Sequence, residues 1–207
     1  NEARALCESA LECANVFESV GMKDIVIAIK HSDTLLNIKA NRMLSSMCDY
    51  PLHIGVTEAG TLRTGLVKSA IGIGTLLSEG IGDTIRVSLS TNVCEEVLAG
   101  KKILQTLGLR KNAVEVVACP TCARTEIDVE GLANKVETMT AGINKPLKIS
   151  VLGCPLNGIG EGEHSDLGIA GGKEKSVILL HGKIYKTVPS ERLMQEFEKI
   201  LQDVLSN

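Results

Sequence analysis

Apolar residues recur along the first half of the chain in two alternating patterns, one with helical spacing and one as short unbroken runs. Apolar side chains three or four residues apart predict helices at 2–20, 34–47, 66–78 and 93–107. Short runs rich in β-branched residues predict strands at 25–29, 52–56 and 84–89. This regular alternation of helix and strand is typical of a parallel sheet, in a doubly wound fold or a β/α barrel.

The pattern changes after residue 110. Strands are predicted at 114–118, 147–152, 176–180 and 183–188, and helices at 129–141 and 189–205. His181-Gly182, between the last two strands, indicates a short hairpin turn. We therefore expect an α/β protein with two domains, residues 1–110 and residues 111–207.

Composition narrows the class of protein. The 207 residues are 44% hydrophobic, which is enough to bury a core. Aromatic residues make up 2%, tryptophan is absent and the net charge is −3, which together argue against nucleic-acid binding. No apolar run approaches the length of a membrane span, and no signal segment opens the chain. We expect a cytoplasmic protein, in which seven cysteines indicate metal or redox chemistry rather than disulfides.

Three cysteines follow predicted strands. Cys119 and Cys122 come after strand 114–118, and Cys154 comes after strand 147–152. The carboxyl ends of parallel strands meet at one edge of a sheet, so these thiols should lie close together. Glycines 153, 158, 160 and 162 surround Cys154, and we expect them to take positive φ so that the backbone can approach an inorganic centre.

The fourth ligand of such a centre is not a cysteine, and Glu161, Glu163 and His164 are the nearby candidates. One interpretation is a structural zinc site of three cysteines and His164, in a binding module without redox activity. An iron–sulfur centre is favoured because proline directly follows cysteine in both motifs, as is common in cluster loops. Four other cysteines fall in or beside predicted helices, where we expect small core residues: Cys7, Cys13, Cys48 and Cys94.

Charged and hydroxyl side chains lie at the ends of the first three predicted strands: Lys30, Glu58, Arg86 and Ser88. In a barrel these positions form the mouth, where catalysis takes place. Lys30 and Arg86 would suit a diphosphate, because arginine offers a bidentate fork and lysine a mobile charge. Three βα units do not close a barrel of eight, and residue 1 lies within a predicted helix, so we expect the C-terminal part of a longer protein.

Five ordered motifs carry a resemblance that runs along essentially the whole chain. They are residues 55–60 (GVTEAG), 67–72 (VKSAIG), 77–84 (LSEGIGDT), 118–122 (ACPTC) and 153–161 (GCPLNGIGE). In this combination the chain resembles the 4-hydroxy-3-methylbut-2-enyl diphosphate synthase family. The resemblance implies an oxidoreductase of isoprenoid biosynthesis, which opens 2-C-methyl-D-erythritol 2,4-cyclodiphosphate with two electrons and two protons and releases water.

The resemblance also implies a fold and a cofactor. Residues 1–110 would be the C-terminal part of a (β/α)8 TIM-type barrel, and residues 111–207 a smaller α/β domain with a [4Fe–4S] cluster. The implied cluster ligands are Cys119, Cys122, Cys154 and Glu161.

Roles for the remaining residues and partners follow from the same resemblance. Lys30, Glu58, Arg86 and Ser88 would bind the cyclic diphosphate, and Glu58 and Glu161 would be the catalytic residues. Ferredoxin or flavodoxin would supply electrons. A homodimer would form each site between the barrel of one subunit and the cluster domain of the other.

Overall fold

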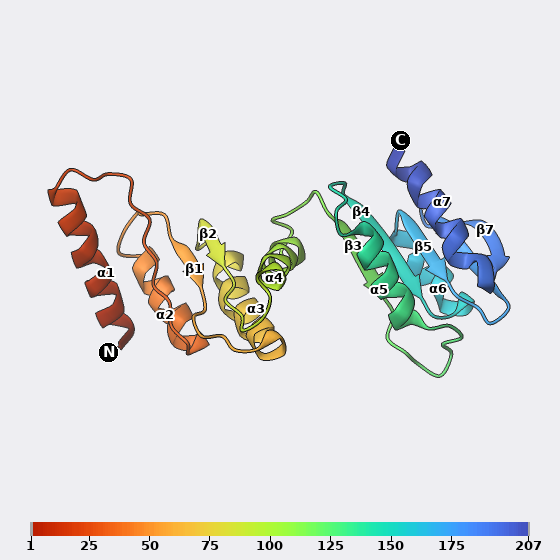
Figure 1. Cartoon of the computed structure of the whole chain (residues 1–207), viewed down its shortest axis with the longest axis horizontal. Coiled ribbons are helices and arrows are strands. Elements are labelled where there is room, and N and C mark those ends of the chain that lie inside the picture. Colours follow the sequence, from red (N-terminus) through yellow and green to blue (C-terminus); the bar gives the residue numbers. More distant parts are fainter. Residues whose placement is uncertain (1, 207) are drawn as a thin grey trace. The chain divides into compact units, whose positions relative to one another are not determined.

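The computed structural model describes residues 2–206 and divides into two compact units, residues 1–110 and 111–207 (Figure 1). The elements of the first unit are α1 (Glu2–Ser19), α2 (Thr34–Ser45), β1 (His53–Gly55), α3 (Leu62–Ser78), β2 (Thr84–Arg86) and α4 (Val93–Thr106). β1 and β2 pair in parallel, with His53 opposite Thr84 and Gly55 opposite Arg86. The unit is therefore α/β, and its two-stranded sheet is not a closed barrel.

The predicted strand at 25–29 is wrong as a strand. It is reduced to a single parallel bridge between Ile27 and Leu52. The Ile27 amide donates to the Pro51 carbonyl, and the His53 amide donates to the Ile27 carbonyl. The segment still runs extended beside β1 and buries Ile27 and Ile29. Lys30 therefore follows the end of an extended segment, as the sequence predicts.

The core of the first unit lies between the helices and one face of β1. Leu52, Ile54 and Val56 are each at most 4% exposed and point to that face. His53 and Gly55 alternate with them and therefore lie on the other face. The strand thus separates an apolar side, packed on helices, from a polar side.

Side chains and glycines at the helix ends explain where the helices begin and end. Asp33 accepts a hydrogen bond from the Leu36 amide and begins α2, and Asn92 accepts from the Cys94 amide and begins α4. Gly80 follows α3 with φ of 76°, and the Ile81 amide returns to the Leu76 carbonyl, which ends the helix.

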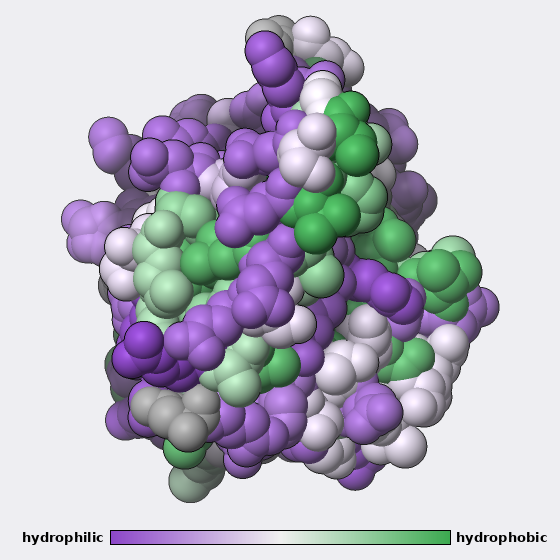
Figure 2. Space-filling view, turned by 90° about the vertical axis from the view of Figure 1, so that its left-hand side faces the viewer, coloured by the Kyte–Doolittle hydropathy of each residue, from purple (hydrophilic) through white to green (hydrophobic). Residues whose placement is uncertain are grey.

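Apolar side chains also remain exposed in the first unit. Five of them lie in the last two turns of α1 and the segment after it: Val16, Phe17, Val20, Met22 and Val26. Figure 2, which faces the α1 end of the chain, shows green hydrophobic patches among hydrophilic residues. No helix within residues 2–206 combines the length and the apolar character needed to cross a bilayer.

The second unit is built on one five-stranded sheet. Its elements are β3 (Val114–Ala118), α5 (Val129–Thr140), β4 (Leu147–Leu152), α6 (Pro155–Glu161), the short 3-10 helix η1 (Gly162–His164), β5 (Leu167–Ala170), β6 (Lys175–Leu180), β7 (Lys183–Pro189), η2 (Ser190–Arg192) and α7 (Leu193–Ser206). The strands follow chain order; β3, β4 and β5 are parallel, and β6 and β7 continue the sheet antiparallel. The bounds predicted for β3 and β4 are confirmed.

Helices cover both faces of this sheet. Ile178 of β6 belongs to the core that also holds Val136 of α5 and Phe197 of α7. The neighbouring residues Val177 and Leu179 point the other way and pack with Ile159 of α6. The sheet is therefore buried on two sides, which explains why β4 reads as a nearly continuous apolar run.

Two features of the second unit differ from the expectation. β5 was not expected, because its Leu-Gly-Ile-Ala sequence is short and half of it is small residues. Residues 155–161, for which no helix was predicted, form helix α6 with Pro155 in its first turn. The hairpin turn is confirmed: His181 and Gly182 join β6 to β7 with φ of 49° and 72°, the values of a type I′ turn.

Candidate functional site

Three loops meet at the carboxyl edge of β3, β4 and β5, and two of them carry the three predicted thiols. The Cys119 amide donates to the Val151 carbonyl, and the Glu126 amide donates to the Gly153 carbonyl. The third loop is joined through the Lys173 amide, which donates to the Glu126 carboxylate over 2.8 Å. These hydrogen bonds join the three loops and hold the two cysteine motifs side by side.

Cys119 and Cys154 lie closest to the sheet. The Gly153 amide donates to the Cys119 sulfur over 3.1 Å, a main-chain hydrogen bond of the kind that tunes thiolates at metal centres. Cys154 is only 8% exposed and caps α6 with extended backbone. A side chain on Gly153 would collide with Val129 at 2.8 Å, so glycine is needed where the two motifs touch.

Cys122 is the exposed thiol of the group. The Arg124 amide donates to its sulfur and lowers the pKa of the thiol, and the Thr125 hydroxyl, 3.8 Å away, lowers it further. Thr125 also accepts a hydrogen bond from the Cys122 amide over 2.9 Å. The loop therefore favours the thiolate, which is the form that binds metals.

Replacing Thr125 with valine is expected to raise the pH midpoint at which Cys122 reacts, because the thiolate loses one hydrogen-bond donor. Iodoacetamide alkylation of the metal-free chain, followed by peptide mass spectrometry across a pH series, measures that midpoint. Thr121→Val in the same loop is the control and should leave it unchanged. Equal midpoints in Thr125→Val and the parent chain would show that the hydroxyl plays no part.

The proposed fourth ligand does not join the thiols in this structure. Glu161 is exposed at the end of α6, seven residues after Cys154, which places it about 10 Å along the helix. Two other candidates, Glu163 and His164, are exposed in η1. Among residues 2–206, no three His, Cys, Asp or Glu side chains converge closely enough to hold a metal ion.

The glycines around Cys154 have a different role from the one expected. Positive φ was predicted for Gly153, Gly158, Gly160 and Gly162, and this is wrong. The glycines with positive φ in the described chain lie elsewhere, at positions 21, 60, 80, 82, 108 and 182. A β-carbon on Gly158 would lie 2.9 Å from that of Ala170, and one on Gly162 would meet Leu179 at 2.4 Å. These two glycines therefore let α6 and η1 pack closely on the sheet.

A pair of cations lies at the strand ends of the first unit. A β-carbon on Gly55 would lie 2.4 Å from the Arg86 carbonyl and 3.4 Å from the Lys30 side chain, so Lys30 passes over β1 beside Arg86. Burial lowers the pKa of the Lys30 ammonium, and the Arg86 guanidinium lowers it further. Among the described residues 2–206 no carboxylate pairs with either cation, so the two together form a suitable place for a polyanion.

His53 was not singled out from the sequence. Its pKa is lowered by burial and then by the charges of Lys30 and Arg86, and its Nδ1 lies 2.8 Å from the Thr84 hydroxyl. The signal that could have found it is the alternation in strand 52–56, which puts His53 and Gly55 on one face. His53 therefore belongs to the polar face that carries the two cations.

Glu58 and Ser88 stand at the same ends of the strands but outside this cationic pair. Glu58 has φ of 51°, in the left-handed region that is uncommon for residues other than glycine. Ser88 follows β2 by two residues and is half-buried. In the part of the chain that the structure describes, neither side chain forms a hydrogen bond or an ion pair.

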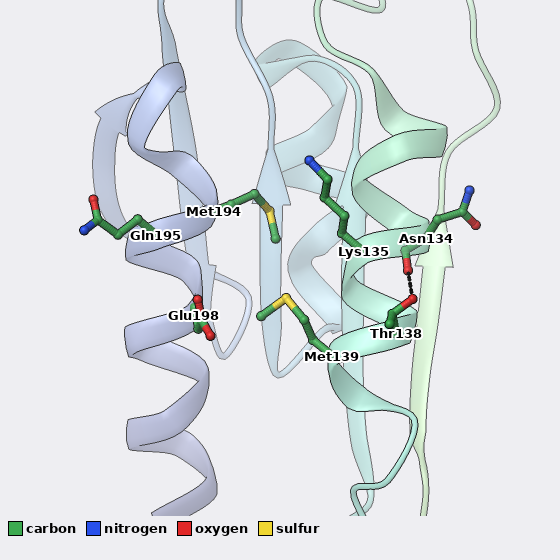
Figure 3. A pocket seen from close by; sticks show the side chains of 7 residues that line it. All are labelled: Asn134, Lys135, Thr138, Met139, Met194, Gln195 and Glu198. Atoms are coloured by element: carbon green, nitrogen blue, oxygen red, sulfur yellow. Dashed lines mark hydrogen bonds between the residues drawn. The ribbon is translucent and has the colours of Figure 1, made fainter.

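A separate groove of about 580 Å³ lies between α5 and α7. Met139 and Met194 point towards each other across it, and Lys135 and Glu198 are among the polar residues that line it (Figure 3). None of the three predicted metal-binding thiols lines this groove, so it is not part of the thiol site.

The class of protein that the fold defines is α/β, with two cations at strand ends in one unit and three thiols at strand ends in the other. Residues 1–101 match the model of the GcpE TIM-barrel domain, and residues 115–203 match that of the GcpE protein C-terminal domain. The chain belongs to the GcpE family.

Curated relatives agree with this assignment. Proteins named 4-hydroxy-3-methylbut-2-en-1-yl diphosphate synthase (flavodoxin) are 53% identical in Caldanaerobacter subterraneus, 50% in Cutibacterium acnes and 49% in Clostridium acetobutylicum. These alignments cover 97%, 93% and 98% of this chain. They cover 57%, 51% and 58% of the relatives, so the chain spans somewhat more than half of their length.

Proposed function

We propose that this chain forms the C-terminal part of a reductive iron–sulfur enzyme. The reaction is the two-electron ring opening and dehydration of 2-C-methyl-D-erythritol 2,4-cyclodiphosphate to 4-hydroxy-3-methylbut-2-enyl diphosphate. The observation that carries the proposal is the match to both family domains in order, together with relatives of about half identity named for this synthase. Two protons and two electrons enter, the ring C–O bond to phosphate breaks, and one hydroxyl leaves as water.

In this proposal the first unit is the end of a TIM-type barrel and binds the diphosphate. Lys30 and Arg86 are adjacent and carry no carboxylate partner in the described chain, which suits the phosphate oxygens. Ser88 would add a hydroxyl donor at the same strand end. Glu58 would either anchor a substrate hydroxyl or give it the proton that it needs to leave as water.

The second unit would hold a [4Fe–4S] cluster through Cys119, Cys122, Cys154 and Glu161. The donor set fits: three thiols lie on loops joined by hydrogen bonds, one thiol is favoured as thiolate and one already accepts a main-chain N–H. When bound, the cluster would supply electrons and a Lewis-acidic iron. The three thiols would draw together on binding and Glu161 would move towards them to complete the ligand set, since a carboxylate is a harder and more easily exchanged iron ligand than a thiolate.

Partners are part of the proposal. The relatives' names contain flavodoxin, which favours a flavodoxin over a ferredoxin as the electron donor. We also propose a homodimer in which each site combines the barrel of one subunit with the cluster domain of the other, and a cytoplasmic location.

Anaerobic reconstitution with iron and sulfide tests the cluster. We expect a brown chain with about four irons and four sulfides. The variant Glu161→Ala should keep about three irons, because three thiolates remain, and the matched variant His164→Ala should keep all four. A colourless chain that holds one zinc, and loses it in His164→Ala, would instead support a Cys3His binding module and overturn the proposal.

A further inference from the structure

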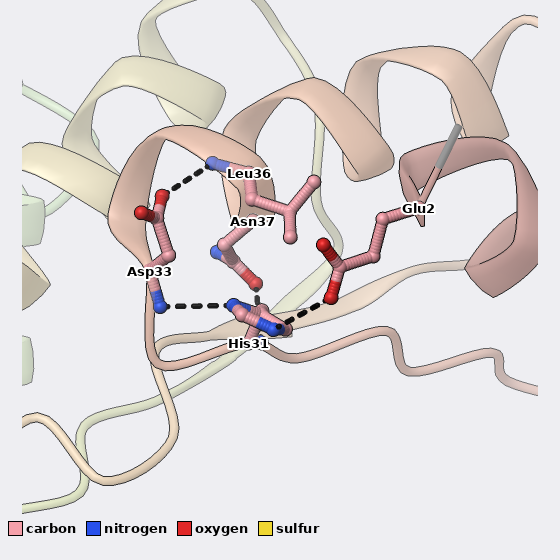
Figure 4. Close-up of polar contacts among 5 residues, drawn as sticks. All are labelled: Glu2, His31, Asp33, Leu36 and Asn37. Atoms are coloured by element: carbon pink, nitrogen blue, oxygen red, sulfur yellow. Dashed lines mark hydrogen bonds and ion pairs between the residues drawn. The ribbon is translucent and has the colours of Figure 1, made fainter.

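The main chain on both sides of Lys30 is held by two buried asparagines of α2. Asn41 Nδ2 donates to the Ile29 carbonyl over 3.2 Å and to the Asn37 carbonyl over 2.9 Å. Asn37 Oδ1 accepts from the His31 amide over 3.1 Å, as Figure 4 shows. Asn37 and Asn41 are 0% and 1% exposed. Residues 29 and 31 are therefore tied to the same helix, one turn apart.

The rest of this segment is held as well. His31 Nδ1 accepts from the Asp33 amide over 2.9 Å, and His31 Nε2 lies 3.5 Å from the Glu2 carboxylate (Figure 4). Lys68 Nζ lies 3.5 Å from the Ser32 carbonyl. Side chains therefore bond three main-chain groups of the segment between Ile29 and α2: the His31 amide, the Ser32 carbonyl and the Asp33 amide.

Burying two amide side chains is unfavourable unless their hydrogen bonds are made. Asn37 Nδ2 makes none, although it is fully buried. The residue therefore retains a polar group that costs stability, and the single side-chain bond that it forms holds His31. A leucine of similar size would fill the same space without that cost, so packing alone does not explain an asparagine here.

We infer that Asn37 and Asn41 are positioning residues that fix the main chain on both sides of Lys30. They thereby hold its ammonium beside Arg86, where both cations can bind a diphosphate. The inference rests on the proposed function for its ligand. Lysine has a flexible side chain, and fixing its Cα removes part of the entropy that would otherwise be lost on binding. The half-buried position of Lys30 is consistent with a group that is held rather than free in water.

Two variants test this, Asn37→Leu and Asn41→Leu, each of which keeps the size of the side chain and removes its hydrogen bonds. The matched control is Ser69→Ala, since the Ser69 hydroxyl is equally buried on α3 and has no hydrogen-bond partner within residues 2–206.

The probe is inorganic pyrophosphate, titrated by calorimetry into the whole chain. We expect its dissociation constant to rise about fivefold to tenfold in both leucine variants and to stay within about twofold in Ser69→Ala. The pKa of Lys30, followed by NMR of its ε-carbon, should rise towards its ordinary value, because a released segment exposes the ammonium to water. Leucine variants that are folded and show neither change would overturn the inference.

One measurement needs no variant and so does not depend on their folding. The His31 amide of the unaltered chain should exchange with solvent at least about a hundredfold more slowly than an unstructured amide. Exchange within about tenfold of the unstructured rate would overturn the inference. Failure of the proposed function is separate: it would appear as a Lys30→Met variant that binds pyrophosphate as tightly as the parent chain.

Discussion

Iron uptake is expected to fall from about four atoms per chain to about one or fewer when Cys119 is replaced by alanine. Cys119 accepts the Gly153 amide and stands where the two cysteine motifs meet. Its loss removes one of three thiolates and leaves Cys122 and Cys154 on separate loops. The cluster then has too few soft ligands to assemble.

The measurement is anaerobic reconstitution with iron and sulfide analysis and a visible spectrum. Cys94→Ala is the matched control, because Cys94 is an exposed thiol at the start of α4 in the other unit. That variant should take up as much iron as the parent chain. Full iron uptake by Cys119→Ala would remove Cys119 from the ligand set.

Replacement of Phe197 with alanine is expected to lower the free energy of unfolding of the second unit by about 3–5 kcal/mol. Phe197 is fully buried in α7 and packs in the core that faces β5 and β6. Truncation removes a large apolar side chain and leaves a cavity that the surrounding strands cannot fill. Urea unfolding followed by far-ultraviolet circular dichroism measures the change.

The chain contains its own control, since it has only two phenylalanines. Phe17 is 48% exposed on α1 of the first unit. Phe17→Ala should therefore change the free energy of unfolding of that unit by less than about 0.5 kcal/mol. Comparable losses in the two variants would mean that Phe197 is not the core residue that its burial indicates.

The sequence predicted the elements whose patterns are strong. β3 and β4 are apolar runs bounded by turns, and their bounds agree with the structure. The segment 25–29 has the same kind of run, but it forms only a single bridge, between Ile27 and Leu52, which a local pattern cannot reveal. α6 was missed because glycines in sequence indicate a loop, whereas here Gly158 meets Ala170 at a crowded contact with the sheet.

The candidate site was predictable from the sequence only in part. Lys30, Arg86 and the three cysteines stand at strand ends, which the sequence locates. His53 was missed because its partners Lys30 and Arg86 come from other segments of the chain. Asn37 and Asn41 were missed because asparagines on a predicted helix normally face solvent, and only the fold brings their amides to residues 29–31.

The unpaired edge of β2 affects how molecules of this polypeptide associate with one another. Within residues 2–206, β2 pairs with β1 alone, so one row of its main-chain N–H and C=O groups has no strand beside it. Such a row is a template on which a strand of another molecule can form. The exposed apolar residues at the end of α1 add a second adhesive surface. We therefore expect molecules of this polypeptide to associate at these two places in concentrated solution.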